Sequence, residues 1–156
     1  MQMLYAGPRA NRGFTLIELL VAVGVIGVLA ALAIPHAVRA REHAANTAFI
    51  SDLRVAREAF ILYNHERNSY PPDKWPGVFP PEMTPYLSDF PWASPTPIRG
   101  SWDWDYLVFG ITAAVSVYQP GVNPDQMSRI DTIIDNGDIN TGDFRQRSGG
   151  YLSVIE

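Results

Sequence analysis

The segment "RGFTLIELLVAVGVIGVLAALAIP", which runs from Arg12 to Pro35, constrains how the rest of this chain can be arranged. From Phe14 onward, its only ionisable side chain is that of Glu18. The apolar run has about the length that a helix needs to cross a hydrocarbon core, roughly 20 residues. An ionisable side chain inside such a run is costly and is functional by default. The segment therefore predicts a membrane helix that has a use for one carboxylate.

The charges on either side of the apolar run indicate its orientation. Arg9 and Arg12 precede it, with no acidic residue among them. Arg39 and Arg41 follow it, with Glu42 beside them, so the difference in charge between the two sides is modest. Because Lys and Arg are retained on the cytoplasmic side, we expect a cytoplasmic N-terminus and an exported C-terminal part.

Two alternatives to a membrane helix with a functional Glu18 are a secretory signal peptide and a plain signal anchor. A secretory signal peptide has an apolar core of roughly 7–15 residues and a cleavage site of small residues, for which Ala31-Leu32-Ala33 would serve. The run here is longer than such a core and contains Glu18. A plain signal anchor fits the length and the charges but treats Glu18 as a tolerated interfacial carboxylate.

The same segment resembles the N-terminus of type IV pilins and of type II secretion pseudopilins. The resemblance implies a leader peptide of residues 1–13, cleavage after Gly13 by a prepilin peptidase, and methylation of the new N-terminus at Phe14. Glu18 then becomes the fifth mature residue, where this family carries its glutamate. Pro35 falls where the family's helix usually has its first proline. Phe14, Glu18 and Pro35 are therefore the residues expected to act in assembly.

The resemblance also implies a domain organisation and a set of partners. Residues 14–38 would form the transmembrane and assembly helix, and residues 39–156 a periplasmic globular domain that includes the amphipathic half of the helix. The chain would cross the inner membrane once and then enter a periplasmic or cell-surface filament. Its partners would be further copies of itself, other pseudopilins, the prepilin peptidase, the inner-membrane assembly platform and membrane lipid.

Electrostatics independently favours a role of Glu18 in assembly. Cleavage after Gly13 would place a positive amine on Phe14, one helical turn from Glu18. In a staggered bundle of helices, that amine could instead meet Glu18 of a neighbouring subunit. A pair of opposite charges is far less costly to remove from water than a lone charge. The glutamate can therefore set the register of assembly.

Helical character continues beyond the apolar run. Pro35 should kink the helix or break it locally, because proline lacks an N–H and clashes with the preceding turn. The segment Asn68 to Pro72 should end the helix, since the residue before a proline disfavours helical geometry. A continuous helix from Phe14 to about Arg67 would be about 80 Å long at 1.5 Å per residue. Its apolar face, with helical spacing, consists of Phe49, Leu53, Ala56, Phe60 and Tyr63.

Residues 71–100 are rich in proline and aromatic residues and predict an ordered loop. A short helical turn is expected from Pro81 to Leu87, with Met83 and Leu87 facing inward. A proline-rich ligand for a partner protein is the alternative. The aromatic residues expected to pack this loop are Trp75, Phe79, Phe90 and Trp92.

Residues 102–110, "WDWDYLVFG", alternate in the way that is typical of a strand. Three aromatic residues share one face, which we expect to pack on the long helix rather than to bind a sugar. Alternation after Gly110 predicts a second strand or a bent continuation of the first, and "FRQR" and "YLSVI" predict two more strands around a turn at 148–150. The aromatic face consists of Trp102, Trp104 and Tyr106, and the opposite face carries Asp103 and Asp105.

A short helix is expected to start after Asn123, which is a good N-cap followed by Pro124. Asn136-Gly137 is a signal for its end. Its buried side is expected to consist of Met127, Ile130, Ile133 and Ile134. The predicted fold class is therefore α+β: a long N-terminal helix, membrane-spanning in its first half, packed on a small antiparallel sheet in a pilin-like arrangement.

An acidic segment near the C-terminus is the candidate metal site. Asp135, Asp138 and Asp143 offer the oxygen ligands that calcium prefers, although their spacing is not that of an EF-hand loop. Some major pseudopilins bind calcium in a C-terminal loop, so the resemblance supports this hypothesis. The alternative is that these aspartates are solvated turn residues beside a helix cap.

Composition excludes several classes of function. The chain has no cysteine and a net charge of −4, which argues against disulfides, thiolate metal sites and nucleic-acid binding. No nucleophile-elbow motif or phosphate-binding loop is present, so we expect no enzyme. The favoured function is a structural subunit of a type II secretion-like pseudopilus. The alternatives are a type IV pilin for adhesion, motility or DNA uptake, and a monomeric membrane-anchored binding domain.

Overall fold

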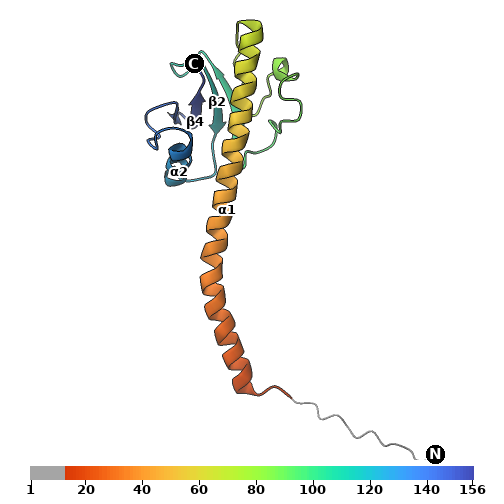
Figure 1. Cartoon of the computed structure of the whole chain (residues 1–156), viewed down its shortest axis with the longest axis vertical. Helices are drawn as coiled ribbons and strands as arrows, with labels where there is room; N and C mark the ends of the chain where they lie inside the picture. Colours follow the sequence, from red (N-terminus) through yellow and green to blue (C-terminus); the bar gives the residue numbers. More distant parts are fainter. Residues whose placement is uncertain (1–12) are drawn as a thin grey trace, which may run out of the picture. The chain divides into compact units, whose positions relative to one another are not determined.

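The computed structural model describes residues 13–156, so the predicted leader lies outside the described residues except for Gly13. The described residues fall into two compact units, which divide after Arg41. A single helix of 52 residues, α1 (Leu16–Arg67), contributes to both. It is the long ribbon coloured from red to yellow-green in Figure 1. The predicted long N-terminal helix is therefore confirmed.

Pro35 lies inside α1, and the helix is assigned without interruption on both sides of it. The local break that we considered at this position therefore does not occur. Proline removes one backbone hydrogen bond from the helix interior. The surrounding segment, "AALAIPHAVRA", contains five alanines, the residue with the highest intrinsic helix propensity, so the helix tolerates the loss.

The C-terminal end of α1 lies where the prolines predicted it. Asn68 adopts a left-handed conformation with a φ of 53°, and its N–H donates to the Asn64 carbonyl at 2.7 Å. A left-handed Asn immediately after the last helical residue is a common helix C-terminus. Pro71 and Pro72 follow and prevent the helix from continuing.

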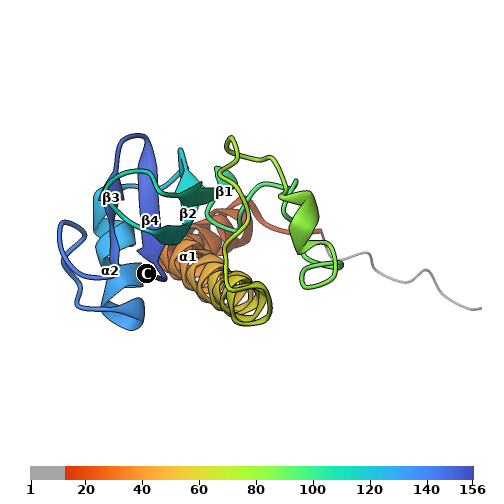
Figure 2. The ribbon, with the colours of Figure 1, turned by 90° about the horizontal axis from the view of Figure 1, so that it is seen from above.

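Four antiparallel strands form one sheet in the order β1-β2-β4-β3 (Figure 2). In the pair β1–β2, Trp104 lies opposite Val115, and in the central pair β2–β4, Val117 lies opposite Tyr151. All four predicted strands are present, but β1 ends at Tyr106, so residues 107–110 of the predicted first strand form the connection to β2 instead. Their bounds are β1 (Ser101–Tyr106), β2 (Ala113–Tyr118), β3 (Phe144–Arg147) and β4 (Gly150–Val154).

The core of the second unit lies between α1 and the sheet. The ring of Phe49 stacks on Trp102 with a centroid distance of 5.5 Å, and Phe60 stacks on Trp104 at 3.8 Å. The indole N–H of Trp104 donates to the Pro71 carbonyl at 2.9 Å, so its polar atom is satisfied although the ring is buried. The aromatic face of β1 therefore packs on the helix, as expected, and is not a sugar-binding surface.

Helix α2 (Pro124–Ile134) begins at the predicted cap, where Asn123 Oδ1 accepts the Gln126 N–H at 2.9 Å. Met127 and Ile130 are fully buried, but Ile133 is 57% exposed, so its predicted burial is wrong. The buried arc includes Asp131 instead, because successive helical side chains are about 100° apart. The arc is thus rotated away from Ile133.

The loop after α1 contains the predicted helical turn as a short 3₁₀ helix, η1 (Pro81–Met83), and Met83 is buried. Trp92 is also buried, whereas Trp75 is 83% exposed, so the expectation that Trp75 packs the loop is wrong. Backbone N–H groups of Lys74 and Gly77 donate to carbonyls of β1. The loop therefore follows the edge of β1, and this course leaves Trp75 outside the core.

Candidate functional site

Thr15 and Glu18 form a capping box at the start of α1. Because the helix begins at Leu16, Thr15 is the N-cap and Glu18 is the third helical residue. Glu18 Oε2 accepts hydrogen bonds from the N–H and the hydroxyl of Thr15, both at 2.8 Å. Thr15 Oγ1 in turn accepts the Glu18 N–H at 3.3 Å. The Thr-x-x-Glu signature would have predicted this cap, but we did not expect it.

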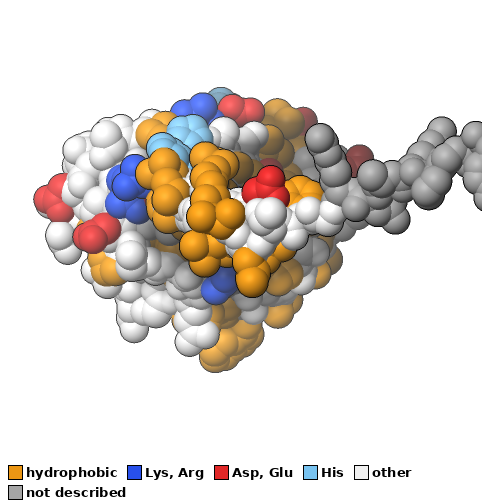
Figure 3. All heavy atoms as spheres, turned by 90° about the horizontal axis from the view of Figure 1, so that it is seen from below, with side chains coloured by type: hydrophobic (Ala, Val, Ile, Leu, Met, Phe, Trp, Pro, Cys, Tyr) orange, Lys and Arg blue, Asp and Glu red, His pale blue; other side chains and the backbone are white. Residues whose placement is uncertain are grey.

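The first half of α1 is apolar and exposed. Its large hydrophobic side chains from Phe14 to Val38 are 53–89% exposed, and none of them is buried in the described structure. The most apolar window of 18 residues has a mean hydropathy of 2.7. By length and composition this helix can cross a membrane. Figure 3 shows hydrophobic side chains gathered on the face seen from below.

Gly13 and Phe14 precede the first helical residue. A side chain placed on Gly13 would meet no described atom within 4 Å, and Phe14 is 82% exposed. Pro35 lies on the same helix but seventeen positions after Glu18, so one chain does not bring these two residues together. The predicted cleavage between Gly13 and Phe14 and the predicted assembly roles remain predictions.

The candidate calcium ligands share one loop, but the carboxylates of Asp135 and Asp138 are engaged by different groups. Asp135 Oδ2 accepts the N–H groups of Asp143 and Phe144, at 2.6 and 3.3 Å. Asp138 Oδ1 accepts the Asn140 N–H at 3.1 Å, and hydrogen bonding from Asn140 lowers the pKa of Asp138. In the described part of the chain, no three His, Cys, Asp or Glu side chains are close enough to hold a metal ion. The loop supplies oxygen ligands without a preformed site.

Asp131, on α2, belongs to the same acidic stretch of sequence, but its burial was not predicted. Its side chain is completely buried, and neither carboxylate oxygen accepts a hydrogen bond of normal geometry from the described residues, although the Gly137 N–H lies near enough to lower its pKa. Burial raises the pKa of Asp131, and the negative charges of Asp135 and Asp138 raise it further. A buried carboxylate without full hydrogen bonding is unfavourable, so the surroundings of Asp131 favour neutralisation of its charge.

A second polar cluster lies on the face of the sheet opposite α1. Arg147 on β3 forms ion pairs with Asp103 and with Asp105, both on β1. All three side chains are no more than 5% exposed. The hydroxyl of Ser116 on β2 donates to Asp105. Alternation correctly placed the two aspartates on one face, but we did not expect their burial, because the arginine that pairs with them is some forty residues away.

Comparisons with known proteins extend the resemblance. The family described as "Prokaryotic N-terminal methylation motif" matches residues 8–34. The type II secretion system core protein G of Dickeya chrysanthemi is 30% identical over 152 residues, covering 91% of this chain and 95% of that protein. The protein of the same name in Pectobacterium carotovorum is 37% identical over 61 residues, covering 39% of each.

Type IV pilus proteins are also similar. The type IV wide pilus major component PilA4 of Thermus thermophilus is 40% identical over 62 residues, covering 40% of this chain and 47% of that protein. The chain thus spans less than half the length of the Pectobacterium and Thermus relatives. No solved structure matches the chain significantly. The Dickeya alignment covers nearly the whole of both proteins. The chain therefore belongs to the pilin-like family that includes the type II secretion system core protein G.

Proposed function

We propose that this chain is a structural subunit of a type II secretion-like pseudopilus that polymerises through α1 and supports protein export. The observation that carries the proposal is the exposed apolar half of α1 with a single carboxylate at its start. A soluble protein rarely leaves so large an apolar surface uncovered. A membrane covers it before assembly, and neighbouring helices cover it within a filament.

The proposal includes the position and the partners of the subunit. The chain crosses the inner membrane once, with its N-terminus in the cytoplasm and residues 39–156 in the periplasm. The proposed boundary at Arg39 lies close to the division of the structure after Arg41, which supports it. The subunit is cut by a prepilin peptidase and engages an assembly platform, further copies of itself and other pseudopilins. We propose no catalytic role, and no nucleic acid among its partners.

A type IV pilin is the second candidate, and the similarity to PilA4 favours it. The proposed pseudopilus is favoured because the Dickeya protein matches over 91% of the chain, whereas PilA4 matches over 40%. Deleting the gene in its host separates the two functions. Loss of an exported protein from the medium supports the pseudopilus, and loss of adhesion, motility or DNA uptake supports the pilin.

Processing provides the direct test of the N-terminus. We expect the intact mass of the mature protein to correspond to loss of residues 1–13 and gain of one methyl group. A Gly13→Leu variant should keep its leader. Since the space around Gly13 is open in the described structure, this substitution tests recognition by the peptidase rather than folding. A mature chain that starts at Ile34, or an uncut wild-type chain, would contradict the proposal.

We further propose that the loop from Asp135 to Asp143 binds calcium, with Asp131 as an additional oxygen donor. The support is the buried, unsatisfied carboxylate of Asp131 beside an oxygen-rich loop. The side chains of Asp135 and Asp138 would have to exchange their present hydrogen bonds for the ion, because these carboxylates do not converge.

Calcium binding should raise the melting temperature of the globular unit. A ligand at 100 times its Kd stabilises the folded state by about 2.7 kcal/mol, which is roughly 10 °C for a domain of about 100 residues. The measurement is thermal unfolding of the full chain in neutral detergent, with calcium or with a chelator. Magnesium is the control ion, and Asp138→Asn should abolish the difference. Equal melting temperatures with and without calcium would remove the ion from this account.

A further inference from the structure

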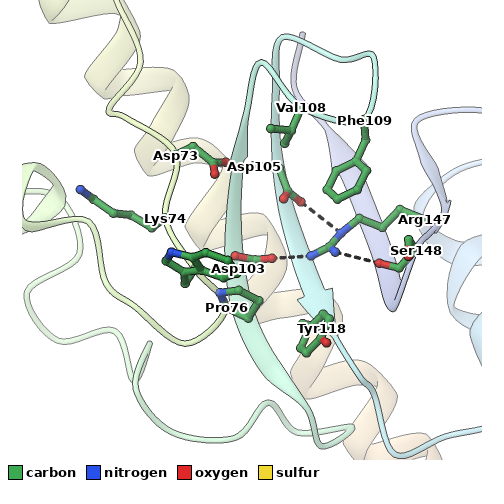
Figure 4. A pocket seen from close by; sticks show the side chains of 11 residues that line it. Asp73, Lys74, Pro76, Asp103, Asp105, Val108, Phe109, Tyr118, Arg147 and Ser148 are labelled. Carbon is green, nitrogen blue, oxygen red and sulfur yellow. Dashed lines mark hydrogen bonds and ion pairs between the residues drawn. The ribbon is translucent and has the colours of Figure 1, made fainter.

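A cavity of about 530 Å³ lies on the face of the sheet that points away from α1 (Figure 4). One wall is the loop along the edge of β1, which contributes Asp73 and Trp75. The other wall is formed by Phe109, from the β1–β2 connection, and Tyr118. Asp103, Asp105 and Arg147 line it as well. Pockets for small ligands commonly have this size and this mixture of aromatic and polar groups.

The floor of the cavity holds one more negative charge than positive charge. Arg147 is the single cation that pairs with both Asp103 and Asp105. Asp105 also accepts a hydrogen bond from Ser116. Asp103 uses Oδ2 for the guanidinium, while its buried Oδ1 accepts no hydrogen bond of normal geometry from the described residues, although the nearby Trp104 N–H lowers the pKa of Asp103. A buried carboxylate without full compensation is unfavourable and favours uptake of a cation.

A proton is one cation that can neutralise this floor. Burial and the neighbouring charge of Asp105 raise the pKa of Asp103 to about 7, although Arg147 opposes the shift. The other charged groups around the cavity are Asp73 and Lys74 at its rim, which formally cancel each other. Any cationic ligand must therefore compete with the proton on Asp103 near neutral pH.

The walls favour an organic cation over a metal ion. Among the residues that the structure describes, no three His, Cys, Asp or Glu side chains converge enough to hold a metal. Aromatic rings, by contrast, attract ammonium and guanidinium groups. Phe109 and Tyr118 already flank the Arg147 guanidinium, at 4.8 and 5.7 Å from their ring centroids. The indole of Trp75, 83% exposed, is an aromatic face open to a second cation.

Backbone strain in the β1–β2 connection also indicates that the cavity is a binding site. Leu107 and Phe109 have positive φ angles of 56° and 51°. For bulky residues without a glycine's freedom this conformation is uncommon, and such strain concentrates at binding sites. It places Phe109 over Arg147 at the wall of the cavity.

We propose that this cavity binds the ammonium or guanidinium group at the end of an alkyl side chain, as in lysine or arginine. The cation pairs with the Asp103 carboxylate, which turns its buried oxygen toward the cavity to do so, and the alkyl part of the ligand contacts Trp75. The group can come from a free amine or from a residue of a polypeptide. Probes of both kinds separate the two sources.

The test uses the full chain in neutral detergent at pH 8 and saturation-transfer NMR. The probes are N-acetyl-lysine methylamide, n-butylamine, and N-acetyl-norleucine methylamide as the uncharged match. We expect both amines to bind at least tenfold more tightly than the norleucine probe. The tighter of the two amines identifies the source. Equal binding of all three probes would overturn the proposal.

Two variants assign the binding to this cavity. Asp103→Asn should weaken amine binding at least tenfold, and Trp75→Ala should weaken it several-fold. Asp89→Asn, which removes an exposed carboxylate outside the cavity, is the matched control and should have no effect. Unchanged amine binding in Asp103→Asn refutes the site.

Stability and pH separate loss of binding from loss of folding. In the folded chain Asp103 keeps its proton up to a pKa of about 7, whereas the unfolded chain loses it near 3.8. Stability from this group therefore falls as pH rises through 7. Asp103→Asn should melt no lower than the wild type at pH 8 while binding amines poorly. Wild-type amine binding should strengthen from pH 6 to pH 8, and a pH-independent affinity would contradict pairing with Asp103.

Discussion

Glu18→Ala should insert into the membrane as well as the wild type or better, yet form almost no filaments. Removing a charge from an apolar helix lowers the cost of insertion, so failed insertion cannot explain the loss. What disappears is the proposed partner of the Phe14 amine of a neighbouring subunit. Removing one member of a buried ion pair costs roughly 3–5 kcal/mol, and each 1.4 kcal/mol is tenfold in affinity. We therefore expect filament yield to fall about 100-fold or more.

The capping box requires a control, because Glu18 has a second role within its own chain. Its Oε2 atom accepts both hydrogen bonds from Thr15. Thr15→Ala removes the hydroxyl of the cap and keeps the charge of Glu18, so this variant should still assemble. Loss of an N-cap side chain costs about 1 kcal/mol, which is small beside the loss of the ion pair.

Glu18→Gln separates charge from capping more sharply. Glutamine can occupy the third position of a capping box, so this variant keeps the local structure and loses only the charge. We expect it to fail in assembly as Glu18→Ala does. The measurement is filament yield by electron microscopy in cells without the wild-type subunit, with membrane levels of each variant checked by blotting. Normal filaments from Glu18→Gln would assign the residue to capping alone.

Local patterns were sufficient to predict most of the fold. The apolar run and its one glutamate predicted the first half of α1, and Pro71 and Pro72 predicted its end. Alternation predicted the strands and the packing of Trp102 and Trp104 on the helix, because period two leaves only one face for the core. These features depend on neighbours in sequence, which a single sequence displays directly.

The rest depends on contacts between distant parts of the chain. Trp75 is exposed because its loop forms hydrogen bonds along β1, and no local pattern indicates that course. The burial of Asp103 and Asp105 requires Arg147 on another strand. Ile133 is exposed because α2 turns Asp131 inward. Each of these outcomes depends on how the helices, strands and loops pack together. Alternation and helical spacing did not predict the burial of Asp103 and Asp105 or that of Asp131.

Phe60→Ala should produce the largest loss of stability in the globular unit. Phe60 is completely buried, stacks on Trp104 at 3.8 Å and contacts Trp92 at 5.8 Å between ring centroids. Truncating a buried Phe costs about 3–5 kcal/mol, because transfer energy is lost and a cavity remains. At roughly 4 °C per kcal/mol for a domain of about 100 residues, the melting temperature should fall by about 12–20 °C.

Leu62→Ala is the matched control on the same helix. Leu62 is 50% exposed and two positions after Phe60, and leucine and alanine have similar helix propensities, so its loss should cost under about 1 kcal/mol. Phe60→Leu should lie between the two, since it keeps most of the apolar volume and loses the stacking on Trp104. Thermal unfolding in neutral detergent measures the differences, and near-UV circular dichroism reports the tryptophan cluster. If Phe60→Ala melted within about 3 °C of Leu62→Ala, the aromatic stack between α1 and β1 could not be the contact that holds the helix to the sheet.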